Sequence, residues 1–262
     1  MYTLGAVVLC GLLVALCEWM FKRLLGGGVG NKIILATSII GTPIHELGHA
    51  LMCLIFGHKI TEMKLWDPRA KNGTLGHVRH SYNRRNIYHR LGNLFIGLGP
   101  IFSGLLIMIV MLLIAFPDNL NTYVTTATEA VSSGERGVSV WIEGIKILPS
   151  LLSESATAPW LRAIAVLVML SVSLHITLSP ADIKGSLGAL PIYLAGVLFV
   201  TLITAVIGKG AMDAVESALA FYNATLTALF AIVLIFSLIL VLFALAVFLL
   251  RTLFGMIFGK RR

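Results

Sequence analysis

The chain has 262 residues, of which 58% are hydrophobic and only 12% are charged, and its mean hydropathy is +0.93. This composition excludes an ordinary soluble globular protein and indicates a polytopic membrane protein, organised as one integral-membrane domain over residues 1–262. The net charge of +8 does not predict a nucleic-acid partner, because the basic residues gather in loops beside apolar segments, without a nucleic-acid-binding motif. The cysteines are Cys10, Cys17 and Cys53. Because their number is odd and none has CxxC spacing, we expect packing residues rather than disulfides or a thiolate metal site.

The first apolar segment covers residues 3–21 and is followed by Lys22 and Arg23. No basic stretch precedes it and no small-x-small cleavage site follows it, so it predicts a retained transmembrane helix rather than a signal peptide. The glycine-rich residues 25–31 predict a flexible connection to the next helix.

Residues 33–56 form a second apolar segment, which is long enough to cross a hydrocarbon core of about 30 Å at about 1.5 Å per residue. Pro43 lies two residues before His45 in this segment. Pro43 either opens the helix to water at that point or is tolerated without a functional role, and the sequence leaves both interpretations open.

The same segment carries His45, Glu46 and His49, which together make an HExxH pattern. Two histidines four residues apart share one face of a helix and can bind a single Zn²⁺, while Glu46 is placed to act as a general base. The alternative is a pair of core histidines satisfied by carbonyl groups, with Glu46 as a structural partner. Three ionisable groups within five residues at membrane depth are costly, which favours the metal site.

A basic loop over residues 57–90 follows the motif helix. Strand-like stretches at 59–66 and 75–82 flank a turn-forming cluster at 67–73, and they predict a small β-hairpin at the membrane surface. An exposed edge strand of this hairpin would suit binding of an extended substrate. We expect solvated or interfacial side chains for the histidines of this loop, which are His58, His77, His80 and His89.

Four further helices are predicted, at residues 91–116, 159–180, 189–208 and about 221–250, with a polar connection at 117–158. The expected fold is therefore an all-α polytopic membrane protein with about six transmembrane helices and a small surface hairpin. Small residues at 97–104 favour close packing, against the motif helix or against another helix.

The distribution of basic residues predicts the orientation in the membrane. With six spans, both termini, the 57–90 loop and the 181–188 loop lie on one side and hold most of the Lys and Arg, so that side is expected to be cytoplasmic. Lys22, Arg23 and Lys32 on the other side argue mildly against this. The default localisation is a bacterial plasma membrane, with the candidate site towards the cytoplasm.

A catalytic zinc normally takes three protein ligands and a water, so a third ligand is needed. No histidine follows the motif in residues 50–56, and Glu62 falls in the basic loop. Asp182 is predicted to lie at a comparable depth, where Pro180 turns the chain; an ion pair with Lys184 is the alternative role for its carboxylate. His175 is the rival ligand, or a group that orients a ligand.

The chain resembles the site-2 protease family of intramembrane zinc metalloproteases over about residues 33–190, its expected catalytic core. The resemblance rests on the pattern from His45 to His49, on Gly99-Pro100 and on Pro180-Ala-Asp182. It implies that His45, His49 and Asp182 bind one Zn²⁺, that Glu46 is the base, and that a membrane-surface β element guides the unwound substrate. Two positions depart from the family pattern: Ile183 follows Asp182 where glycine is frequent, and Ser103 stands where asparagine is frequent.

The expected function is that of a zinc-dependent intramembrane endopeptidase acting on a membrane-protein or transmembrane peptide substrate. The alternative is a non-proteolytic metal-binding membrane protein or transporter. A transporter would favour polar groups spread along a path and a repeat between halves, whereas this sequence has one compact cluster. The sequence does not identify a substrate-binding residue or a regulatory partner.

Overall fold

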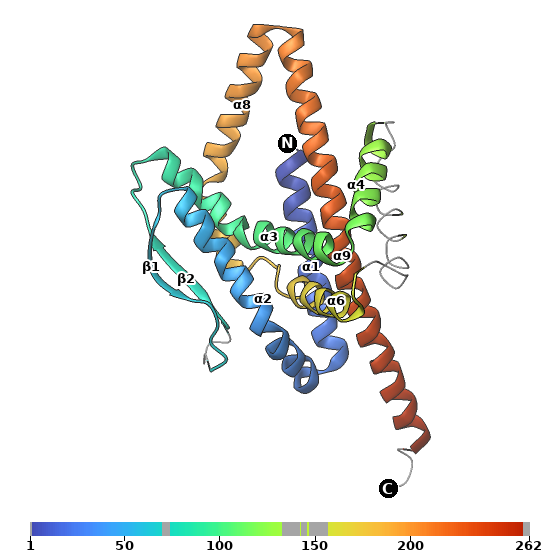
Figure 1. Cartoon of the computed structure of the whole chain (residues 1–262). Helices are drawn as coiled ribbons and strands as arrows, with labels where there is room; N and C mark the ends of the chain where they lie inside the picture. The colour runs from blue at the N-terminus through green and yellow to red at the C-terminus, as the bar shows by residue number, and fades with distance from the viewer. Residues whose placement is uncertain (1, 70–73, 133–141, 143–145, 147–156, 259–262) are drawn as a thin grey trace.

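The computed structural model of the chain, drawn in Figure 1, describes residues 2–69, 74–132, 142, 146 and 157–258. It is mostly helical and carries one two-stranded antiparallel sheet. Within these residues, four helical stretches are long and apolar enough to cross a membrane: Gly28–Ile55, Ile87–Ala115, Leu190–Ile207 and Lys209–Phe254. The membrane class is supported, whereas the expected count of six spanning helices is not confirmed.

The first two helices form a tight corner. Helix α1 covers Tyr2–Leu25 and helix α2 covers Gly27–Ile55. Only Gly26 separates them, with a φ of 75° that favours glycine. The predicted flexible connection over residues 25–31 was therefore wrong, because α2 already begins inside it. Helix α2 also continues through Pro43 without a break.

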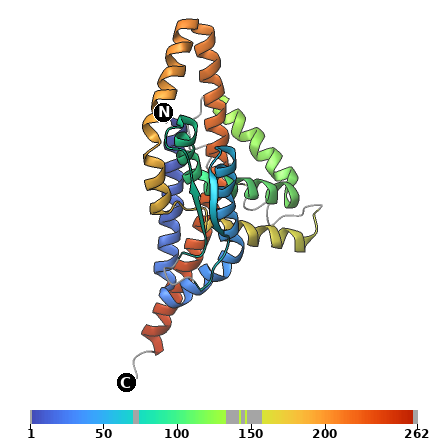
Figure 2. The same ribbon diagram turned by 90° about the vertical axis from the view of Figure 1, so that its left-hand side faces the viewer.

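A β-hairpin follows α2, as the sequence predicted. Strand β1 (Lys59–Lys64) pairs with strand β2 (His77–Ser81), with an irregular register between Ile60 and Glu62. Figures 1 and 2 show that the hairpin folds back along α2. The indole Nε1 of Trp66 donates a hydrogen bond to the Ser38 hydroxyl at 2.9 Å, which ties the far end of the hairpin to α2. Its position at a membrane surface stays a prediction.

Helix α3 (Ile87–Ala115) begins earlier than predicted, because the Asn86 side chain accepts hydrogen bonds from the first backbone N–H groups of the helix. Helices α2 and α3 pack closely at two glycines. A Cβ atom on Gly48 would lie 2.5 Å from the Gly99 carbonyl oxygen. The Ser103 hydroxyl donates to the carbonyl of Ile44 at 2.8 Å. The predicted close packing at residues 97–104 is confirmed, and the motif helix is the partner at Gly99 and Ser103.

The middle of the chain differs from the prediction in two places. Residues 117–132, expected as part of a polar connection, form helix α4 (Pro117–Ser132); most of the rest of that connection lies outside the described residues. Helix α6 (Pro159–Ser173) ends before residue 180, and residues 174–179 are non-helical. Helix α7 (Pro180–Leu187) then starts with Ser179 as its N-cap and Pro180 in its first turn.

The chain ends in helix α8 (Leu190–Ile207) and helix α9 (Lys209–Phe258), which join at Gly208 with a φ of 119°. Helix α8 matches the predicted bounds, whereas α9 is longer than predicted at both ends. Helix α8 has no buried residue, so its exposed apolar surface suits contact with lipid or with another protein.

Helices α1 and α9 lie side by side and run in the same direction (Figure 1). Val14 and Val233 belong to one buried cluster, and further along both helices the Arg251 guanidinium donates to the carbonyl of Leu25 at 3.0 Å. The start of α1 and the end of α9 therefore lie at opposite ends of the bundle. This contradicts the expectation that both termini lie on one side.

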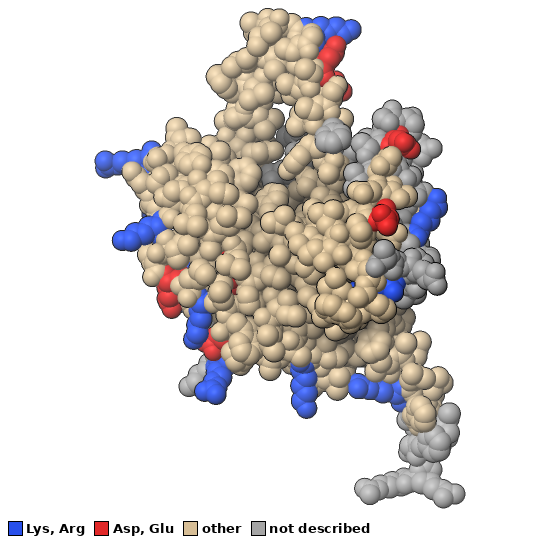
Figure 3. All heavy atoms as spheres, in the orientation of Figure 1, with Lys and Arg blue, Asp and Glu red and all other residues tan. Residues whose placement is uncertain are grey.

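The surface and the interior are both consistent with a membrane protein. In Figure 3, Lys, Arg, Asp and Glu lie around the edge of this face of the molecule, and the broad area between them is uncharged. The three cysteines are buried and unpaired, as predicted for packing residues.

The contact between α2 and α3 yields a first prediction. Gly48→Ala places a Cβ against the Gly99 backbone, which cannot move as a flexible side chain can. Overpacking of this kind costs about 1–3 kcal/mol, so thermal unfolding in detergent should occur at a lower temperature. The matched control is Gly196→Ala, whose Cβ meets nothing within 4 Å. Equal unfolding temperatures for the two variants would contradict this packing.

Candidate metal centre

The histidines of the motif lie one helical turn apart on α2, and each is oriented by a backbone carbonyl. Nδ1 of His45 lies 2.8 Å from the carbonyl oxygen of His175, and Nδ1 of His49 lies 2.7 Å from that of Ile96. A carbonyl oxygen can only accept, so each Nδ1 carries the proton. Both Nε2 atoms are then unprotonated and free to bind a metal.

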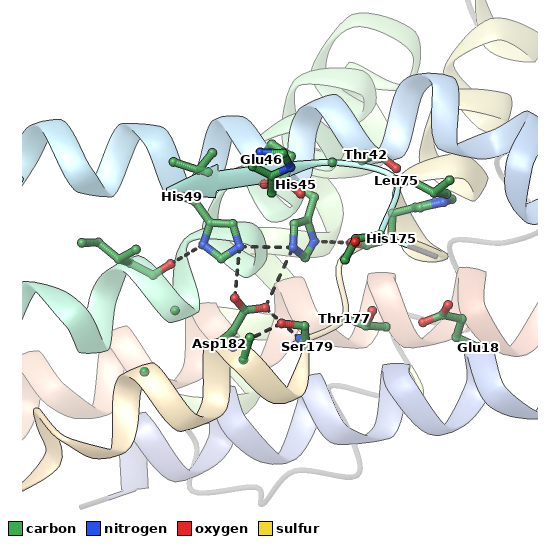
Figure 4. A pocket seen from close by; sticks show the side chains of 18 of the residues that line it. Glu18, Thr42, His45, Glu46, His49, Leu75, His175, Thr177, Ser179 and Asp182 are labelled. Atoms are coloured by element: carbon green, nitrogen blue, oxygen red, sulfur yellow. Dashed lines mark hydrogen bonds and ion pairs between the residues drawn. The ribbon is translucent and has the colours of Figure 1, made fainter. Parts of the chain in front are cut away.

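Asp182 reaches these nitrogens from α7, as Figure 4 shows. Its Oδ1 lies 3.3 Å from Nε2 of His49, and its Oδ2 lies 4.0 Å from Nε2 of His45. A capping box fixes the carboxylate: the backbone N–H of Ser179 donates to Oδ2 at 2.8 Å, and the Ser179 hydroxyl accepts from the N–H of Asp182 at 3.2 Å. One ligand atom from each of the three residues lies within 4.8 Å of the others.

This donor set fits a cation. The two Nε2 atoms lie 3.2 Å apart, and neither has a proton to donate to the other or to the carboxylate. Three electron-rich groups facing one another in a half-buried site repel unless a positive charge lies between them. Two imidazoles and a carboxylate are a frequent ligand set of catalytic zinc, with the fourth position left to water. If these were only core histidines with satisfied hydrogen bonds, the two carbonyl groups would explain the Nδ1 atoms. The close approach of the two Nε2 atoms would remain unexplained.

The structure also separates the candidates for the third ligand. His175 belongs to the site through its backbone carbonyl, while its own Nδ1 donates to the carbonyl of Ser171 at 2.8 Å. It therefore orients His45 rather than completing the ligand set. Among the described residues, Lys184 forms no ion pair with Asp182.

Glu62, considered as a ligand from the sequence, is not brought to the centre. It lies in β1 with half of its side chain exposed and pairs with Arg79 at 2.8 Å and His77 at 3.0 Å. The hydrogen bond from His77 and the charge of Arg79 hold the pKa of Glu62 below its ordinary value.

A pocket of about 450 Å³ contains the whole centre. His45, Glu46, His49 and Asp182 line it together with residues of the hairpin. Glu46 is only 6% exposed, because Gly76 covers it: a Cβ on Gly76 would lie 3.0 Å from Oε1 of Glu46. The pocket thus brings the predicted base and the predicted ligands together.

Two positions acquire roles that sequence reasoning missed. The Ser-x-x-Asp spacing from Ser179 to Asp182 is a recognisable capping box, so it was available as a signal for an oriented carboxylate. The role of Gly97 had no local signal. A Cβ on Gly97 would lie 2.6 Å from the carbonyl oxygen of Asp182, so only glycine lets α7 lie this close to α3. Ser103 donates a hydrogen bond to the backbone of α2.

The chain matches no protein family, no curated protein and no solved structure among those compared. The case for the site therefore rests on its own geometry.

The contact at Gly97 yields the second prediction. Gly97→Ala should push α7 away from α3 and move the Asp182 carboxylate, so zinc affinity should fall about 10-fold or more, as for other changes behind a metal ligand. Competition with a chromogenic chelator measures this affinity. In the control Gly188→Ala, the new Cβ meets its nearest atom at 4.0 Å. Unchanged zinc affinity in Gly97→Ala would show that α7 does not position the third ligand.

Proposed function

We propose that this protein is a zinc-dependent intramembrane endopeptidase, similar to the site-2 proteases, that hydrolyses peptide bonds of membrane-embedded substrates. One observation carries the proposal. Three metal-ligand side chains from α2 and α7 converge in one pocket with a buried carboxylate, among helices apolar enough to span a membrane.

In this proposal His45, His49 and Asp182 hold one Zn²⁺. When bound, zinc would act as a Lewis acid that makes a water nucleophilic at neutral pH and polarises a peptide carbonyl. The carbonyls of His175 and Ile96 keep each Nε2 unprotonated for this purpose. The backbone N–H of Ser179 keeps the Asp182 carboxylate turned to the same point.

Glu46 is the general base of the proposed reaction. Its carboxylate lines the same pocket as the ligands and is not used as a ligand itself. It would accept a proton from the attacking water and return it to the leaving amine. Cover by Gly76 of the hairpin keeps bulk water away from Glu46, which favours proton transfer to the substrate.

The apolar helices support a substrate that arrives within the lipid bilayer. A helical substrate has to unwind locally before its peptide bond can reach the centre, because a helix engages its own carbonyl groups in hydrogen bonds. We propose an integral membrane location, with the bacterial plasma membrane as the membrane concerned. Because the start of α1 and the end of α9 lie at opposite ends of the bundle, a site towards the cytoplasm is proposed only from the basic residues of the 57–90 loop.

Replacement of the base gives the third prediction. Glu46→Gln should lower cleavage of a single-pass substrate about 10²- to 10⁴-fold, the usual contribution of general acid–base catalysis. Zinc content should stay at the wild-type level, since Glu46 is not a ligand. Cleavage of a reconstituted substrate and metal analysis of the same preparation measure both quantities.

The control for Glu46→Gln is Glu62→Gln, which alters an exposed carboxylate of the hairpin outside the metal-ligand set and should leave cleavage near the wild-type level. If Glu46→Gln cleaves as fast as the wild type, the enzymatic proposal is wrong. Movement of zinc across vesicles without proteolysis would instead support the alternative, a metal-binding membrane protein or transporter.

Removal of the metal gives the fourth prediction. A zinc chelator should abolish cleavage, and added zinc should restore it. His49→Asn keeps an N–H that can reach the Ile96 carbonyl but lacks the Nε2 atom, so the purified variant should hold little zinc and added zinc should not restore its activity. Full zinc content in His49→Asn would remove His49 from the ligand set.

A further inference from the structure

Three histidines outside the proposed ligand set meet at the base of the hairpin. His58 follows α2, His80 lies in β2 and His89 lies in the first turn of α3. His58 is only 4% exposed, so the expectation of a solvated or interfacial side chain was wrong for it. Its ring stacks on Tyr82, with centroids 4.7 Å apart.

The hydrogen bonds of His58 fix its own tautomer and, through it, the tautomer of His80. Nε2 of His58 lies 2.7 Å from the carbonyl oxygen of His89, so this nitrogen carries a proton. In a neutral ring, Nδ1 of His58 is then an acceptor. It lies 2.9 Å from Nδ1 of His80, which must therefore donate. The remaining nitrogen of His80, Nε2, is left without a proton.

The opposite arrangement would need a positive charge on His58, because both of its nitrogens would then donate. Burial disfavours that charge. It lowers the pKa of His58 below its ordinary value, although the hydrogen bond to the His89 carbonyl acts in the other direction. Burial, followed by the charge of neighbouring His58, also lowers the pKa of His80. Burial thus favours neutral rings, with the tautomers given above.

His80 also lines the pocket that holds the metal centre. Because its Nδ1 is engaged with His58, Nε2 is the ring nitrogen available to a ligand of the pocket. We infer that His80 presents this unprotonated Nε2 as a hydrogen-bond acceptor for a backbone N–H of the peptide substrate, and that His58 is the positioning residue which fixes its tautomer. This inference rests on the proposed peptidase function and names a substrate contact for it.

A backbone N–H is the chemical group that such an acceptor suits. A peptide that unwinds at membrane depth exposes N–H groups, each of which costs free energy when it has no acceptor. The carboxylates that line this pocket have other tasks: Asp182 belongs to the proposed ligand set, Glu46 to proton transfer, and Glu18 pairs with Lys22. Nε2 of His175 is fully enclosed, so it is not accessible to a substrate. Nε2 of His80 is therefore a free acceptor in this pocket, whereas Nε2 of His77, which also lines the pocket, lies 3.0 Å from Oε1 of Glu62.

Ester-substituted peptides test the contact directly. Replacing one backbone amide by an ester removes a single N–H, and the replacement is moved along the peptide, leaving the scissile bond unchanged. Affinities are measured on zinc-loaded Glu46→Gln, so that no cleavage is needed. At one position the ester should weaken binding about 2- to 10-fold, as expected for one lost hydrogen bond. In Glu46→Gln/His80→Asn this penalty should disappear.

His80→Asn is the informative variant because its amide can still donate to His58 while the pocket acceptor is gone. His80→Gln, which can place an oxygen near the position of Nε2, serves as the rescue variant and should restore part of the ester penalty. If the ester weakens binding equally in Glu46→Gln and in Glu46→Gln/His80→Asn at every position of the peptide, the inference is overturned. Absence of cleavage by the wild type would instead overturn the proposed function. The affinity comparison does not require cleavage, so the two failures can be told apart.

The tautomer itself is measurable by ¹⁵N NMR on histidine-labelled full-length protein. The expected spectrum shows His80 protonated at Nδ1 and unprotonated at Nε2. In His58→Gln, which keeps an N–H for the His89 carbonyl but removes the acceptor for His80, this single tautomer should be lost. A purely structural role of His58 would leave the tautomer of His80 unchanged. Protonation of His80 at Nε2 in the wild type would overturn the inference.

Discussion

The arrangement of this protein depends on the meeting of two unprotonated imidazole nitrogens and one carboxylate inside an apolar helical structure. His45 and His49 come from one helix and Asp182 from another, and each is held by a backbone group: the carbonyls of His175 and Ile96 and the N–H of Ser179. Electron-rich groups 3.2 to 4.0 Å apart are unfavourable neighbours on their own. A cation at their centre turns the same arrangement into a stable one, which is why the geometry favours a metal centre.

Close backbone contacts make this meeting possible. Gly48 and Gly99 let α2 and α3 touch, and Gly97 lets α7 lie against α3. Helix packing in lipid relies on such small residues, since apolar side chains gain little by leaving lipid for one another. The non-helical residues 174–179 supply the carbonyl of His175 and the cap of α7. Irregular backbone at membrane depth is tolerated where it lines a protein cavity, and this segment lines the pocket of the candidate metal centre.

The hairpin contributes to the centre as well as covering it. It is joined to α2 at one end by the bond from Trp66 to Ser38 and at the other by the contact of His80 with His58. Between these points Gly76 lies over Glu46. The proposed base is therefore enclosed between its own helix and a two-stranded sheet. An open channel would supply more water, whereas this cover leaves a pocket of about 450 Å³ beside the proposed base.

The sequence by itself determined the features that arise from local pattern. Apolar segments predicted helices at α1, α2, α3 and α8, alternation around a turn predicted the hairpin, and the spacing of His45 and His49 placed both on one helical face, because helix and strand periods act over a few residues. Tertiary structure decided the rest. Asp182 lies 133 residues after His49, and its choice over His175 followed from where α6 ends and which atoms face the pair, information that no local period contains. The parallel course of α1 and α9 likewise followed from packing between distant segments. The burial of His58 was also invisible in the sequence, since a basic loop gives no sign that one of its histidines is enclosed by Tyr82 and the start of α3.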